Sequence, residues 1–101
     1  MGFTKFFNLG ENKGLDCDFE TKEGIVVGNC KRTKQQKDGT QVSDGQNFNV
    51  YADPSNDCEP AITGHYNVLD NDSEVIKQVR EMTKKGCKRG SKKGLLPQKA
   101  Q

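Results

Sequence analysis

The sequence has no tryptophan, one histidine and few apolar residues of any kind. Hydrophobic side chains make up 31% of its 101 residues, close to the level at which chains stop forming a packed core. A net charge of only +2 argues against the disordered class, which combines low hydrophobicity with a high net charge. We therefore expect a folded domain whose small core needs additional stabilisation.

Long apolar runs are also missing. No segment is long enough to cross a membrane as a helix, and the first ten residues, MGFTKFFNLG, lack the apolar core of a signal peptide. If the protein is secreted, we expect that a signal peptide was removed and that Met1 was added to the mature chain. A native Met1 would instead indicate an intracellular protein with reduced cysteines.

What the sequence does contain is four widely spread cysteines, Cys17, Cys30, Cys58 and Cys87. No two are close enough for the CxxC spacing of a zinc knuckle or a thioredoxin-like redox site. An even number of scattered cysteines in a small polar chain predicts two structural disulfides and an oxidising, extracellular setting. Four cysteines allow three pairings.

Several segments have the composition or alternation of β-strands. Residues 24–30 are rich in β-branched side chains and predict a mostly buried strand, whereas residues 46–52 alternate apolar and polar side chains and predict a half-exposed one. Between them, Asp38-Gly39 and Asp44-Gly45 favour positive φ angles, so we expect hairpin turns there. Further strand patterns lie at residues 15–20 and 61–69.

One helix is predicted to begin at Asp72 or Ser73 and to end at Gly86, where a left-handed cap is expected. Its apolar stripe consists of Val75, Ile76, Val79 and Met82. Cys87 follows at once and can fasten the helix across the sheet. We therefore predict an α+β fold: a small antiparallel β-sheet with a C-terminal helix packed on one face, stapled by two disulfides, in a single domain over residues 1–87.

The chain beyond Cys87 is basic, with Lys88, Arg89, Lys92, Lys93 and Lys99 and no acidic residue. Gly, Ser and Pro interrupt these charges, so we predict a flexible basic tail over residues 88–101. Such a tail is either a solvated terminus or a contact arm for an anionic surface such as phospholipid, acidic glycan or nucleic acid. Its first four basic residues are the candidate binding residues.

A second basic cluster occupies residues 31–37 and is expected to lie in a loop. Its first two residues, Lys31-Arg32, also have the pattern of a dibasic processing site.

The order of strand, Ser-Asn-Asp-Cys58, strand or loop, helix and Gly-Cys-Lys88, preceded by Leu-Gly10 and Cys17, resembles the viral killer toxins of smut fungi and related small secreted effectors of plant-associated fungi. The resemblance implies an α/β sandwich held by disulfides and non-enzymatic action on a host or competitor target. The nested arrangement in that family, together with the need to anchor the helix end, predicts the disulfides Cys17–Cys87 and Cys30–Cys58.

The sequence contains one group of residues that could act in catalysis. The single histidine, His65, follows Glu59 by six residues, and a small ribonuclease would add an arginine such as Arg32 or Arg80. A lone histidine on a strand is more often a surface residue than a base, so we expect no enzyme. Residues 70–73 hold two aspartates that could ligate calcium and a glycosylation sequon at Asn71, but helix capping accounts for the acidic pair.

Two function classes remain open. The first is a secreted, monomeric effector or toxin-like protein that uses no cofactor and binds a host or competitor protein or an anionic surface. The alternative is a small nucleic-acid-binding or other intracellular protein with free cysteines and a basic C-terminal arm. Counting free thiols under non-reducing, denaturing conditions separates the two.

Overall fold

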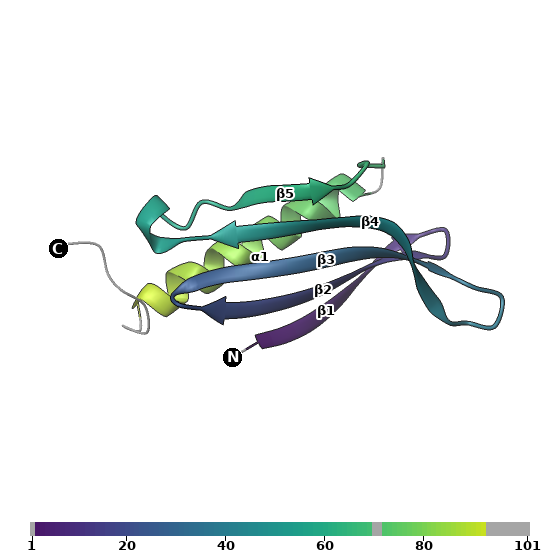
Figure 1. Ribbon diagram of the computed structural model, residues 1–101, viewed down its shortest axis with the longest axis horizontal. Helices are drawn as coiled ribbons and strands as arrows, with labels where there is room; N and C mark the ends of the chain where they lie inside the picture. Colours follow the sequence, from purple (N-terminus) through teal and green to yellow (C-terminus); the bar gives the residue numbers. More distant parts are fainter. Residues whose placement is uncertain (1, 70–71, 93–101) are drawn as a thin grey trace.

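The computed structural model describes residues 2–69 and 72–92. Five strands form one antiparallel sheet in which each strand pairs with the next along the chain (Figure 1). The strands are β1 (Gly2–Gly10), β2 (Lys13–Lys22), β3 (Ile25–Gln35), β4 (Gln41–Ala52) and β5 (Ala61–His65). A short 3-10 helix, η1 (Pro54–Asn56), follows β4, and the helix α1 (Asp72–Lys92) lies across one face of the sheet. The predicted α+β fold with two disulfides is confirmed.

The core lies between α1 and the sheet face that the helix covers. Every second side chain of a strand points to this face, and Val75 and Val79 of α1 pack against it, as the predicted stripe requires. Gly28 keeps the middle of the sheet thin, because a Cβ atom there would collide with the side chains of Phe19 and Val50. The buried members of this cluster are Phe7, Leu9, Leu15, Cys17, Phe19, Cys30, Phe48, Val50, Val75 and Val79.

The predicted strands are present, the last of them only from Ala61 to His65, and the sheet contains one strand more than was predicted. Strand β1 was not predicted, although Phe3, Phe7 and Leu9 alternate along it and lie on the helix side of the sheet. Residues 31–37 were expected in a loop, and this was wrong for most of them, because β3 continues to Gln35. The proposed dibasic site is therefore part of a strand, with Arg32 buried.

Of the two predicted turns, one is present and the other lies inside a strand. Asp38-Gly39 lies in the turn that joins β3 to β4, where Gly39 has a φ of 90° and Asp38 accepts a hydrogen bond from the backbone N–H of Thr40. Asp44-Gly45 is not a hairpin turn but lies inside β4, where the β3–β4 register shifts. The positive φ of Gly45, 88°, serves a β-bulge at this point.

The disulfides join Cys17 to Cys30 and Cys58 to Cys87, so the predicted nested pairing was wrong. A two-residue turn at Glu23-Gly24, with φ angles of 53° and 84°, joins β2 to β3 and places Cys17 directly opposite Cys30. The helix does have a distant anchor, as expected, but that anchor is Cys58, which follows η1.

The helix is longer than predicted. It continues through Gly86 and Cys87 to Lys92, so the left-handed cap at Gly86 was wrong. The buried stripe also continues, since Thr83 and Cys87 are fully buried one and two turns beyond Val79. The first residues assigned to the flexible tail are thus helical, and residues 93–101 lie outside the described residues.

We expect Gly86→Ala to stabilise the protein by about 0.5–1 kcal/mol, because alanine reduces the conformational entropy of the unfolded chain and favours the helix. Gly86 has a helical conformation, and a Cβ atom added there meets no neighbouring atom within 4 Å. Urea unfolding of the two proteins measures the difference. A loss of stability would instead indicate the left-handed cap that the sequence predicts.

Candidate functional site

The solvent face of α1 carries a dense group of cations. Because side chains three, four and seven apart share one side of a helix, the residues opposite Val75 and Val79 form a single ridge. We call it the basic face of α1: Lys77, Arg80, Lys84, Lys85, Lys88 and Arg89. Five of these six are exposed and Lys84 is partly exposed, and the acidic residues among them are Glu74 and Glu81. From Lys77 to Lys88 the ridge is about 16 Å long.

One cation of this face is tied to the rest of the fold. Lys84 Nζ lies 2.9 Å from Glu59 Oε1, in the segment between η1 and β5. The hydrogen bond and charge of Glu59 raise the pKa of Lys84, and Lys84 lowers the pKa of Glu59 in return. Exposed pairs of this kind add little stability, so the main effect is to hold Lys84 beside its neighbours on the ridge.

The predicted binding residues belong to this ridge in part. Lys88 and Arg89 are exposed on α1, and the helix ends at Lys92. Lys93 lies outside the described residues. Lys77, Arg80 and the two lysines before Gly86 were not predicted as binding residues, because the helix was expected to end at Gly86 and the later charges were assigned to a separate tail. A helical projection continued past Gly86 would have joined the two groups.

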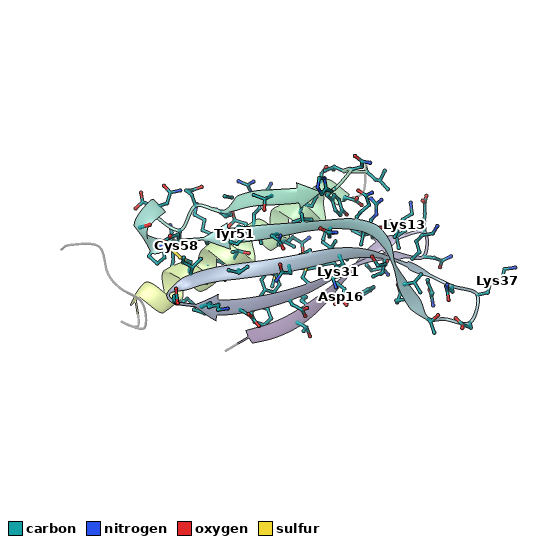
Figure 2. The ribbon with its side chains drawn as sticks, viewed as in Figure 1. Lys13, Asp16, Lys31, Lys37, Tyr51 and Cys58 are labelled. Carbon is teal, nitrogen blue, oxygen red and sulfur yellow. A yellow bond between two sulfur atoms is a disulfide. The ribbon has the colours of Figure 1, made fainter. Side chains whose placement is uncertain are left out.

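The opposite face of the molecule has a different character. No described element covers the outer side of the sheet, where Asp16, Lys31 and Tyr51 point away from the helix (Figure 2). Asp18 and Glu20 share this side with Asp16 along β2. The two broad faces of the fold therefore differ in charge, with cations concentrated on the helix and carboxylates on β2.

A second cluster of charged groups, around Arg32, is buried. Its Nε donates to Asp44 Oδ2 at 2.6 Å, and its Nη1 lies 3.1 Å from Asp72 Oδ2. The same carboxylate oxygen of Asp72 accepts from Tyr66 Oη at 2.9 Å and from the backbone N–H of Leu69 at 3.1 Å. The guanidinium also lies 5.2 Å from the centre of the Tyr66 ring. These contacts join β3, the β4 bulge and the start of α1.

The contacts around Arg32 shift the pKa values of two neighbouring groups, Asp44 and Tyr66. Partial burial acts to raise the pKa of Asp44, but the hydrogen bonds from Arg32 and from the Gln46 N–H and the charge of Arg32 outweigh it and hold the pKa below its usual value. Burial raises the pKa of the Tyr66 hydroxyl, and its hydrogen bond to Asp72 adds to the shift. Arg32 is thus committed to structural contacts rather than exposed to a substrate.

The structure does not assemble the ribonuclease-like set considered for the sequence. Glu59 pairs with Lys84, Arg32 is held in its buried cluster, and His65 is exposed on β5 opposite Asn47. Of the residues considered for calcium, Asp72 instead accepts the three hydrogen bonds described above. Asp70 and the sequon residue Asn71 lie outside the described residues.

No family model, curated protein or solved structure matches this chain. In the part of the chain that the structure describes, no helix combines the length and apolar character that crossing a bilayer requires.

We expect the stability of the protein to fall in acid through Asp44. A carboxylate with a lowered pKa stabilises the fold above its unfolded-state pKa of about 3.9, and this contribution is lost as the pH falls through the folded-state pKa. Asp44→Asn should cost about 1.5–3 kcal/mol at pH 7, the range for hydrogen bonds to charged groups. Urea unfolding at pH 7 and pH 2.5 should show the wild-type and variant curves converging in acid.

Asp16→Asn is the matched control, since Asp16 is an exposed aspartate of β2. It should change the unfolding free energy little at either pH. Equal pH dependence of wild type and Asp44→Asn would rule out a role for Asp44 in acid unfolding.

Proposed function

We propose that the protein is a secreted, disulfide-stabilised binding protein that acts on its target without catalysis, and that the basic face of α1 contacts an acidic glycan on that target. The observation that carries the proposal is the row of six basic side chains on one side of a rigid helix. A ridge of this kind attracts polyanions over a range that salt shortens.

The two disulfides support an extracellular site of action, because disulfides persist in oxidising compartments and all four cysteines are paired. The same pairing weighs against the intracellular alternative, which requires free cysteines. An extracellular setting favours acidic glycans over nucleic acids as the polyanion that this face would meet.

The composition of the basic face also favours a glycan over a lipid bilayer as its binding partner. Its exposed residues are polar or charged, and the apolar side of α1 is buried against the sheet. A helix that binds in the membrane interface needs a free apolar side to insert, which α1 does not offer. The resemblance to smut-fungus killer toxins and effectors stays a prediction and supplies the class of target, a host or competitor cell.

The test removes charge from the helix and, in a matched control, from the sheet. Lys77, Lys85 and Lys88 are replaced together by glutamine, which leaves the Lys84–Glu59 pair intact. The control replaces Lys22 of β2, Lys34 of β3 and Lys37 of the β3–β4 turn by glutamine. All three are exposed. Both variants lose three positive charges, so they differ only in where those charges were.

We expect the helix variant to bind heparin about tenfold more weakly at 50 mM salt, since three exposed charge contacts together contribute about 1–2 kcal/mol. The control should stay close to wild type, and titration of heparin by isothermal calorimetry compares all three proteins. Equal losses in both variants would show attraction to net charge alone. Tighter binding to single-stranded RNA or to phosphatidylserine vesicles than to heparin would replace the glycan as the partner.

A further inference from the structure

Strand β1 is an outer strand of the sheet, and no other described strand pairs with its outer edge. It is 9 residues long, against 5 for β5 at the other edge. Phe3 and Phe6 are 54% and 51% exposed on it, on opposite faces of the sheet. Exposed edges are normally protected by charges, proline, bulges or a covering segment. Strand β1 has one charged residue, Lys5, and its register shift lies at its end, between Asn8 and Gly10.

The sheet register shows which backbone groups of β1 point outward. The two-residue turn at Glu23-Gly24 makes Lys22 and Ile25 a hydrogen-bonded pair, and hydrogen-bonded and non-hydrogen-bonded pairs alternate along an antiparallel ladder. Cys17 and Cys30 are then a non-hydrogen-bonded pair, in agreement with their Cα separation of 4.1 Å. The N–H and C=O of Cys17 therefore point to β1.

Because Cys17 lies opposite Lys5, the backbone groups of Lys5 point back to β2. The alternation then directs the N–H and C=O groups of Thr4, Phe6 and Asn8 away from the sheet. Within the described residues these groups have no backbone partner, so they form a row of donors and acceptors that can serve as the template for another strand.

We propose that this edge binds a second copy of the chain, with two β1 strands pairing antiparallel about a two-fold axis at Phe6. Phe6 is the midpoint of Gly2–Gly10, so this register gives the longest overlap of the two strands. It aligns Thr4 with Asn8 of the second copy and Phe6 with its own equivalent. Their outward-facing groups can form about six backbone hydrogen bonds.

The side chains favour the same register. Lys5 lies opposite Phe7 of the second copy, a pairing that repeats the contact within each chain, where Lys5 Nζ lies 5.5 Å from the centre of the Phe7 ring. The neighbouring register, centred on Lys5, places two lysines directly opposite each other and is destabilised by their like charges. The two Phe6 side chains leave the backbone opposite each other on the open face of the sheet, and each ring folds back over Gly14 of its own chain, so the rings do not obstruct the pairing.

The resulting dimer has one continuous ten-stranded sheet. A two-fold axis perpendicular to the sheet keeps both α1 helices on the same side, so the two basic faces point in one direction. Sheets of this size are near the upper end of what open, twisted sheets reach. The sequence predicts a monomer, and the outer edge of β1 is the reason to expect a dimer instead.

Sedimentation of the full chain tests the proposal. The mass of the wild-type chain, 11.2 kDa, should approach twice that value as its concentration rises from about 10 μM to about 1 mM, which spans the dissociation constants of weak complexes. Phe6→Lys places two lysines opposite each other at the axis and should weaken the dimer at least about tenfold. Ile62→Lys, the same type of change at the opposite edge, should leave the dimer unchanged.

A second variant covers the case in which Phe6→Lys does not fold. Thr4→Pro removes an outward-facing N–H, which the monomer's own ladder does not use, and should also abolish the dimer. In wild type, amide exchange measured by NMR should slow with concentration at Thr4, Phe6 and Asn8 but not at Lys5. A wild-type chain that stays monomeric at 1 mM would overturn the proposal, as would a dimer broken by Ile62→Lys instead.

Discussion

The guanidinium of Arg32 is the contact on which the arrangement of sheet and helix depends. From β3 it reaches Asp44 in the β4 bulge, at 2.6 Å, and Asp72 at the first residue of α1, at 3.1 Å. Burial of such a group is costly unless every partner is present, and here Tyr66 and Leu69 complete the coordination of Asp72. Removing one partner from such a hydrogen-bonded charge pair costs about 1.5–3 kcal/mol, a large fraction of the roughly 5–15 kcal/mol by which domains are stable.

The two disulfides complement this cluster at other points of a thin core. Cys17–Cys30 joins adjacent strands, whereas Cys58–Cys87 ties the C-terminal half of α1 to the segment after β4. The helix is thus held near its start by Arg32 and near its end by Cys87. In the chain-entropy model, loops of this size contribute about 3–4 kcal/mol each. A chain with so few apolar residues can fold because these contacts supplement hydrophobic burial.

Outside this core, the fold has three surfaces that differ in charge and hydrogen bonding. The helix presents cations, the open face of the sheet presents the carboxylates of β2, and β1 presents an unpaired edge. The sequence predicted the basic face of α1 only in part. Lys88 and Arg89 were predicted as binding residues, but they were assigned to a flexible tail rather than to the helix. The edge could not be predicted, because the sequence does not state which strand lies outermost or which side of its backbone is paired.

The sequence by itself determined the α+β class, the apolar stripe of the helix and the alternation along β2 and β4, because periods of 2 and 3.6 residues are properties of local backbone geometry. The cysteine partners, the bulge at Asp44-Gly45 and the end of the helix were decided by tertiary structure. The two-residue turn at Glu23-Gly24 determines that Cys30 lies opposite Cys17. The helix continues past Gly86 because Thr83 and Cys87 are buried against the rest of the fold. The bulge and the end of the helix depend on contacts between residues far apart in the chain, which no local pattern specifies. The cysteine partner depends on the register of one hairpin, which the strand patterns alone leave open.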